Sequence, residues 1–530
     1  MLQLTTLERM IPMKTNYNIN QLTLDISTSY IPKKENTAWF INELVEALEI
    51  SESYIFGRPR EYSLSLMLKL VLFAYTRSVF SSRKIEQLAE ESLPARWLTQ
   101  ESEPTYRTIA RFRESNDLEE LINKSLEHLT SYLREQQLID DALFIDGTKI
   151  LADANKYSFV WKRNTIRFDQ MNRENIYALL TELKEAHQAS HIPEGSNFTL
   201  EFLDEIITRL ELRLEDLENE VVATKKVSPN PWKQERRYLK SKTRKLKERR
   251  NKMVEHQVQS LTYGKRNSYS KTDHDATFMR VKEDPMQNGQ LKPAYNLQIA
   301  TCNQFILGYD IYQNPTDTRT LIPFLERMKL NDQPSKYIVA DAGYGSESNY
   351  RYLEDFLPEH TPLIPYSTML KENSKKWKTD ERKVMNWNYC AADDFYIDPL
   401  GVRFVFNAYR ERKDKDGFVR YLKEYRAEKY NENQDVVPDA LTKSGRVRII
   451  LVNQELEYFK AKQKRLLSSK ETASIYARRK IDVETVFGQM KAYLNFNRFM
   501  LRGIDKVRKE TGIIIMALNM HKLAVRAKNT

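Results

Sequence analysis

The sequence predicts a mixed α/β protein in which a small sheet and its helices are interrupted by long insertions. Amphipathic helices fill most of the first 139 residues, and apolar strands recur between residues 140 and 365. At 530 residues the chain can hold roughly three or four units of ordinary size. We expect an N-terminal helical DNA-binding domain at 1–139, a catalytic sheet region at 140–365 with a helical coiled-coil insertion at 165–265, a partly β insertion at 366–470, and C-terminal helices at 471–530.

The composition favours a polyanionic partner. The chain carries 84 Lys and Arg against 73 Asp and Glu, a net charge of +11. A basic surface that serves only solubility is the alternative. The two cysteines, Cys302 and Cys390, indicate neither a disulfide framework nor a cysteine zinc site. The longest apolar stretches are too short to span a bilayer, so we expect a cytoplasmic protein.

The helical first part contains a candidate DNA-recognition helix. The stretches "SSRKIEQLAEESLPARWL" and "SEPTYRTIARFRES" predict two helices joined by a short turn. The second stretch carries Arg107, Arg111 and Arg113, which makes it a candidate for contacting DNA. A helical bundle with a solvated basic face explains the same pattern.

Two apolar strands each end on an aspartate that small residues follow. In "ALFIDG" the strand 142–145 stops at Asp146. In "YIVADAGYG" the strand 337–340 stops at Asp341. A hairpin that turns near Asn303 and a helix in "DTRTLIPFLERMKL" lie between them. Because Asp also caps turns, one such acid alone decides little.

A third candidate acid lies on the late helix "ASIYARRKIDVETVFGQMKAYLNF". Glu484 lies beside its apolar face, and Lys480 and Lys491 flank it at helical spacing. An ordinary ion pair on a surface helix is the alternative. Three carboxylates, two at strand ends and one beside the core, suit two hard cations at a scissile phosphate. Three other aspartates compete for these places: Asp273, Asp275 and Asp317.

The helical insertion combines an acidic and a basic helix. The first has a heptad seam of apolar residues: Leu203, Ile207, Leu210, Leu214, Leu217 and Val221. The second carries eleven Lys and Arg between Lys233 and Lys252, against two Glu. If it folds back through the turn 225–232, ion pairs with the first helix would neutralise much of its charge. Neutralisation and direct contact with DNA therefore both stay open.

Six stretches, in this order, resemble bacterial insertion-sequence transposases of the DDE class: "FIDGTKILADANKY", "TDHDATFMRVKED", "LKPAYNLQIAT", "NPTDTRTLIPFLE", "VADAGYGSESNY" and "RRKIDVETVFGQMKAYLNFNRFMLRG". The resemblance implies an RNase H-like catalytic domain, a mixed sheet flanked by helices, beside an N-terminal all-α domain. It implies that Asp146, Asp341 and Glu484 form the DDE triad and hold two Mg²⁺ or Mn²⁺ ions.

The same resemblance implies an activity and a set of partners. The protein would bind the terminal inverted repeats of its element, cleave phosphodiester bonds there and join the freed ends to target DNA. Double-stranded DNA of the element ends and of the target would be its partner. We further expect a homodimer in the synaptic complex, no membrane, and a place at the bacterial nucleoid.

The late helix departs from the family spacing by one residue. In the family a Tyr, an Arg, the Glu and a Lys follow one another with two, three and six residues between them. Here Tyr476 and Arg479 each lie one residue too far from Glu484. On a regular helix Lys480 lies about 40° from Glu484, and Arg479 about 140°. We therefore expect Lys480, Lys491 and Tyr476 to contact DNA, unless the helix is distorted near residue 480.

Two other functions fit these residues. One is an RNase H-like DNA nuclease that cuts without strand transfer, because a fold does not fix a function. The other is a non-catalytic DNA-binding protein whose acids are structural. The sequence leaves open the inverted-repeat sequence, the target preference and the chemistry of second-strand cleavage.

Overall fold

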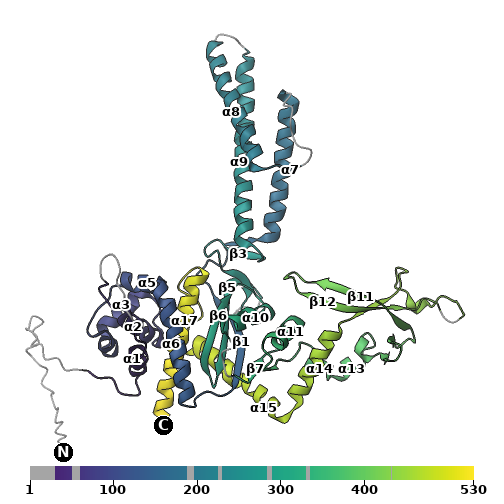
Figure 1. The fold of residues 1–530 in the computed structure, drawn as a ribbon. Helices are drawn as coiled ribbons and strands as arrows, with labels where there is room; N and C mark the ends of the chain where they lie inside the picture. Colours follow the sequence, from purple (N-terminus) through teal and green to yellow (C-terminus); the bar gives the residue numbers. More distant parts are fainter. Residues whose placement is uncertain are drawn as a thin grey trace, which may run out of the picture.

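A mixed six-stranded sheet forms the centre of the molecule (Figure 1). The computed structural model describes residues 30–50, 60–187, 196–224, 229–282, 289–329, 335–430 and 433–529. The strands of the sheet are β1 (Ala142–Leu151), β4 (Thr277–Arg280), β5 (Leu291–Cys302), β6 (Phe305–Tyr312), β7 (Tyr337–Ala340) and β8 (Thr361–Leu363).

The strand order combines antiparallel and parallel pairing. β5 pairs antiparallel with β1 along one edge, and with β6 and β4 along the other. β7 and then β8 follow on the far side of β1, each parallel to its neighbour. The order β6–β5–β1–β7–β8 therefore has three antiparallel strands followed by two that run parallel to β1.

The hairpin predicted near Asn303 is confirmed. β5 ends at Cys302 and β6 begins at Phe305, so the turn has two residues. Asn303 and Gln304 have φ angles of 50° and 64°. Positive φ at both positions is typical of the tight turns whose twist matches the strands of a hairpin.

The two faces of the sheet bury different helices. Side chains alternate along a strand, so Phe144 of β1 packs into one core while Leu143 and Ile145 pack into another. The second core is closed by the helices α10 (Leu321–Arg327) and α11 (Glu347–Phe356). The first core contains the N-terminal and C-terminal helices. Which face a side chain lies on therefore decides which helices it can meet.

The N-terminal helices share their core with the C-terminal helix α17 (Ile504–Asn529). They are α1 (Thr37–Glu46), α2 (Leu64–Thr76), α3 (Ser82–Glu91), α4 (Leu93–Thr99), α5 (Tyr106–Glu114) and α6 (Asn116–Glu135). α17 packs against α1, α2, α5 and α6, and also against β6. Its stretch 513–517 is fully buried, as expected for a helical stretch that is apolar all round. No helix in the described part of the chain is long and apolar enough to cross a membrane.

One predicted N-terminal helix is divided in two. The stretch "SSRKIEQLAEESLPARWL" forms α3 and α4, which are separated at Ser92. Pro94 lies in the first turn of α4, where the missing amide hydrogen of a proline costs nothing. The same proline could not continue α3, so the break is local in origin.

The helical insertion is a long arm that stands away from the sheet (Figure 1). It consists of α7 (Lys162–His187), α8 (Leu200–Ala223) and α9 (Pro231–Tyr263), above the small pair of strands β2 (Phe159–Trp161) and β3 (Ser268–Ser270). Of the predicted heptad seam, Leu203, Ile207 and Leu217 are buried. Residues 225–228 of the predicted turn lie outside the described residues. α9 packs against both α7 and α8.

The second insertion contains a five-stranded antiparallel sheet, in agreement with the predicted strands in "VRFVFNAYR" and "GRVRIILVN". Its strands are β9 (Asn388–Cys390), β10 (Phe395–Ile397), β11 (Arg403–Lys413), β12 (Val419–Ala427) and β13 (Ile449–Val452). The short helices around it are α12 (Met369–Glu372), α13 (Lys375–Lys378), η3 (Val384–Asn386) and η4 (Pro438–Ala440), and α14 (Gln454–Ser468) leads back to the central sheet.

The predicted late helix forms, but it is not a regular α-helix throughout. Its segments are α15 (Lys470–Arg479), the π-helical η5 (Lys480–Glu484), α16 (Thr485–Gly488) and the π-helical η6 (Gln489–Tyr493). η5 packs against β1 and β5. The distortion therefore lies where this helix meets the centre of the sheet.

Candidate active site

Asp146 and Asp341 lie side by side at the centre of the sheet. β1 and β7 are parallel neighbours, and Ile145 pairs with Ala340. The next residue on each strand is the candidate aspartate. By the alternation of side chains, both aspartates face the same side as Phe144, the side on which η5 packs. The sheet thus brings together two acids that are 195 positions apart in the sequence.

Asp146 does not end its strand, contrary to the expectation from the sequence. β1 continues to Leu151, and Asp146 pairs with Ile299 of β5 in the middle of the antiparallel ladder. Only the parallel neighbour β7 stops, at Ala340. Gly147 is needed because a Cβ atom there would lie 2.1 Å from the Gln298 side chain. The Gly that suggested a strand end instead permits close cross-strand packing.

The environment of Asp146 disfavours its charged form. Its Oδ1 accepts a hydrogen bond from the backbone amide of Gly147 at 2.8 Å. Burial, and secondly the charge of Asp341, raise the pKa of Asp146 to about 6. Asp341 accepts a hydrogen bond of 2.8 Å from the backbone amide of Gly343, in the loop that follows β7. Two neighbouring carboxylates with few donors are a site that gains by binding positive charge.

Arg479 supplies positive charge in this structure. Its Nη1 lies 3.1 Å from Oδ2 of Asp146, and both side chains are largely buried. Lys480, which the sequence predicted at this position, is exposed, and Arg479 is instead the cation paired with Asp146. The π-helical segment is the reason, because its i→i+5 hydrogen bonds take one residue more per turn than an α-helix. Arg479 and Glu484, five residues apart, consequently lie roughly one turn apart.

Two other predicted residues of this helix, Tyr476 and Lys491, lie near the same place. Tyr476 is partly buried against the first core. Burial raises the pKa of Tyr476 above its usual value, and the nearby positive charge of Arg479 offsets part of this rise. Lys491 donates a hydrogen bond of 3.3 Å to the carbonyl of Lys149, farther along β1. Glu484 is exposed at the end of η5.

A polar layer beside the aspartates escaped the sequence prediction. Gln298 lies opposite Gly147 on β5 and donates to Asp317 at 3.1 Å. The hydroxyl of Tyr344, which is fully buried, donates to Gln298. Burial, together with the charges of Asp146, Asp317 and Asp341, raises the pKa of Tyr344. The signal was present, since Tyr344 lies in "DAGYG", but its partners come from other strands.

The competing aspartates have different surroundings. Asp317 is near Asp146 but accepts from Lys149 at 3.1 Å, Asn296 at 2.7 Å and Gln298 at 3.1 Å. Asp273 accepts from the Tyr295 hydroxyl and from the amide of Gly503. Asp275 accepts from the amide of Ile504. Asp273 and Asp275 therefore hold the first turn of α17, where a helix favours negative charge.

The basic helix of the N-terminal part is only partly exposed. Arg107 and Arg111 of α5 are exposed, as a DNA contact requires. The expectation that Arg113 contacts DNA is wrong, because its side chain is 3% exposed and lies 3.0 Å from the buried carboxylate of Glu510 in α17. Arg113 also donates to the Tyr75 hydroxyl at 2.6 Å. It joins the N-terminal helices to the C-terminal helix.

The two aspartates fit a divalent cation as a pair. Carboxylate oxygens are the ligands of hard cations such as Mg²⁺ and Mn²⁺, and a cation would relieve the repulsion between two buried acids. Among the described residues, no three His, Cys, Asp or Glu side chains are grouped so as to hold a metal ion. Glu484 is thus not in place as a third ligand here, although it follows Arg479 on the same helix.

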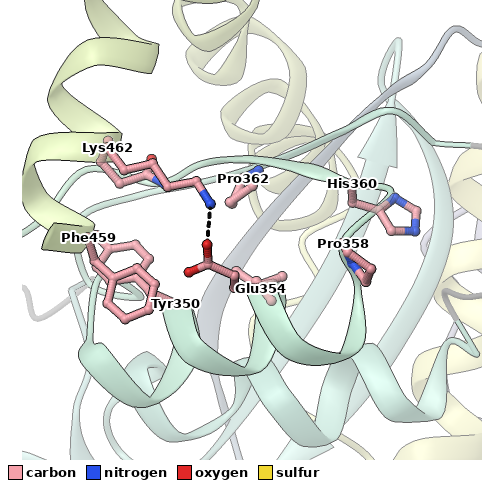
Figure 2. A pocket seen from close by; sticks show the side chains of 9 residues that line it. Tyr350, Glu354, Pro358, His360, Pro362, Phe459 and Lys462 are labelled. Carbon is pink, nitrogen blue, oxygen red and sulfur yellow. Dashed lines mark hydrogen bonds and ion pairs between the residues drawn. The ribbon is translucent and has the colours of Figure 1, made fainter. Parts of the chain in front are cut away.

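A cavity of about 210 Å³ lies on the other side of the sheet, between α11 and α14 (Figure 2). Glu354 and Lys462 form an ion pair of 2.9 Å across it. Its other lining residues include Tyr350, His360 and Phe459. None of the three candidate carboxylates lines it, so it is separate from the candidate site.

Family models match two parts of the chain. The model described as "Transposase DDE domain" matches residues 266–520, and the model described as "Transposase domain (DUF772)" matches residues 27–115. The first match includes Asp341 and Glu484, and Asp146 precedes it. The second covers α1 to α5. No curated protein matches the chain.

The strand order and the paired aspartates agree with the RNase H-like fold that a DDE domain implies, and this class carries out metal-dependent phosphoryl transfer on DNA. With both matches together, the chain belongs to the insertion-sequence DDE transposases.

Proposed function

We propose that this transposase binds the terminal inverted repeats of its own insertion sequence, cleaves phosphodiester bonds at the ends and transfers the freed 3′ ends to target DNA. The observation that carries the proposal is the placement of Asp146 on β1 beside Asp341, which directly follows the parallel neighbour β7, on the face that η5 covers. Cleavage and strand transfer are both phosphoryl transfers, so one acidic site can serve both.

We assign Asp146, Asp341 and Glu484 as the carboxylates that hold two Mg²⁺ or Mn²⁺ ions. Such ions activate the attacking oxygen and stabilise the leaving oxygen when they are bound. Asp146 and Asp341 are already adjacent. Glu484 is exposed, so its side chain is free to turn, and it lies roughly one turn from Arg479 at the site.

The basic residues around the acids are assigned to DNA. Arg479 holds Asp146 in this structure, and a cation at the aspartates would release its guanidinium for a phosphate oxygen, which it can bind with two hydrogen bonds. Lys491 and Tyr476 lie on the same helical run and complete this surface. Lys480 is exposed nearby, where a contact with DNA stays a prediction.

The N-terminal helices are assigned to the recognition of the element ends. Arg107 and Arg111 are exposed cations of α5, and its N-cap Thr105 accepts a hydrogen bond from Thr108. A helix that presents exposed cations to solvent suits the major groove. Two ends must be held together for transposition, so we further propose a homodimer on DNA, located at the bacterial nucleoid.

One assay separates this function from its alternatives. Purified protein is incubated with Mg²⁺, a labelled duplex of one element end and a supercoiled target plasmid. We expect nicking at the end of the element and joined end–target products. Nicking without joined products would indicate a nuclease, and binding without nicking would indicate a non-catalytic DNA-binding protein.

A further inference from the structure

The arm presents a basic face that the fold of the arm does not use. α9 has 33 residues and is therefore about 50 Å long. Its apolar side, which includes Leu239, Leu246 and Met253, packs into the arm. α8 and α7 cover α9 from two sides, and the rest of its circumference faces solvent.

The sides of α9 that meet the neighbouring helices are neutralised by ion pairs. Arg250 pairs with Asp204 of α8 at 2.7 Å, and Arg236 pairs with Glu218 at 2.6 Å. Two further lysines pair with acids of the arm, Lys247 with Glu211 and Lys242 with Glu182. The predicted neutralisation by the acidic helix is therefore confirmed for Arg236, Lys247 and Arg250, whereas Lys242 pairs with α7. We call these four cations the inner set.

The exposed side of α9 carries cations that lack such partners. Six residues of this side are exposed: Lys233, Arg237, Lys240, Arg244, Lys245 and Lys252. At about 100° per residue, the first four lie within roughly 60° of one another, and we call them the outer set. Within the described residues, the only ion pair of the outer set joins Arg244 to Glu248, at 3.8 Å, with both side chains largely exposed (74% and 66%).

The outer set is unfavourable for an isolated arm. Lys233 and Arg237, and likewise Lys240 and Arg244, are like charges four residues apart, and such pairs destabilise a helix by a few tenths of a kcal/mol, about 0.2 to 0.5. The inner set shows that this chain places acids opposite cations where two helices meet. On the outer side no other helix of the described chain supplies them, so the charges point to a partner that is itself negative.

We propose that the outer set of α9 binds the phosphate backbone of double-stranded DNA, without reading its sequence. From Lys233 to Arg244 the outer set extends for about 17 Å along the helix, roughly half of the 34 Å of one turn of duplex DNA. Cations along a rod-like ridge can meet successive phosphates of one groove edge, and they release counterions when they do. The inference rests on the proposed function only in taking DNA as the partner.

The test compares two variants with equal changes of charge. In the outer variant, Lys233, Arg237, Lys240 and Arg244 are all replaced by Gln. In the control variant, the inner set, Arg236, Lys242, Lys247 and Arg250, is replaced by Gln. The dissociation constants for a duplex of one element end and for an unrelated duplex of the same length are measured over a range of salt concentrations, together with the thermal midpoint of each protein.

We expect the outer variant to lose salt dependence on both duplexes, by about 0.9 units of slope per lost contact and so by up to about 4 units, with an unchanged or higher thermal midpoint. The control variant should have a lower thermal midpoint, because it leaves acids of α7 and α8 without partners. An outer variant with the slope of the wild type would overturn the inference, and so would one whose slope changes only because its thermal midpoint falls. Nicking and joining by the wild type report separately on the proposed function.

Discussion

Two pairs of aspartates in this molecule look alike in the sequence but differ in their surroundings. Asp273 and Asp275 receive hydrogen bonds from a tyrosine hydroxyl and from the first backbone amides of α17. Asp146 on β1 and Asp341, directly after the parallel neighbour β7, lie next to each other, and each receives a backbone hydrogen bond. The first pair accepts hydrogen bonds from several donors of the protein itself, although burial still raises the pKa of Asp273. The second pair retains negative charge that Arg479 offsets in part.

The difference shows how a structural acid can be told from a candidate metal ligand. A buried carboxylate that several donors satisfy stabilises the fold, and removing it leaves those donors without a partner. A buried carboxylate beside another carboxylate costs stability, and such a cost is common at functional sites.

The largest effect is expected for the paired acids. Asp146→Asn and Asp341→Asn should each reduce cleavage of an end duplex by about a thousandfold or more, because an amide is a poor ligand for Mg²⁺. Binding of the duplex and the thermal midpoint should be retained. Asp273→Asn is the matched control, and it should lower stability by about 1 to 3 kcal/mol while the folded fraction still cleaves. Cleavage by either of the first two variants at the wild-type rate would remove that residue from the site.

The next effect concerns pH in the absence of divalent cations. The pKa of Asp146 is raised from 3.8 to about 6 in the folded protein. The folded state therefore binds this proton more tightly than the unfolded state does, and the stabilisation is present below pH 3.8 and is lost as the pH rises through 6. The Asp146→Asn variant has no carboxyl group at this position, so its stability lacks this dependence on pH.

Chemical denaturation at several pH values measures this difference. Relative to Asp146→Asn, the wild type should lose about 2 kcal/mol of unfolding free energy between about pH 4 and pH 7. Mg²⁺ should restore part of the loss at neutral pH, because it binds the charged form. A constant difference in unfolding free energy between the two proteins over this range would show that the pKa of Asp146 is not raised in the folded state.

The smallest effect tests the geometry of the late helix. Arg479→Ala should reduce cleavage or binding of the end duplex by about tenfold, or about 1.4 kcal/mol, because Arg479 is the cation at the acids. Lys480→Ala, which differs by one position and removes the same charge, should have much less effect. Rates measured with saturating and with limiting duplex separate binding from cleavage. The opposite order would mean that the π-helical segment is absent when DNA is bound.

The sequence by itself named the two aspartates as candidate ligands and determined the helical first part, the hairpin and the charged arm. Local patterns were sufficient for these because apolar runs, turn residues and heptads act over a few positions. The sequence also marked the anomaly in the late helix, where Arg479 and Tyr476 lie one residue too far from Glu484. It could not decide between Lys480 at the site and a distorted helix.

Only the tertiary structure decided which of these residues contact one another. The late helix forms a π-helical turn where it packs against β1 and β5. This turn lets Arg479, rather than Lys480, form the ion pair with Asp146. Packing of α5 against α17 buries Arg113 with Glu510, so a cation that suggested DNA recognition holds two ends of the chain together. β1 continues past Asp146 because β5, from a distant part of the chain, pairs with it. Each outcome depends on elements far apart in the sequence, and local propensity carries no information about which of them meet.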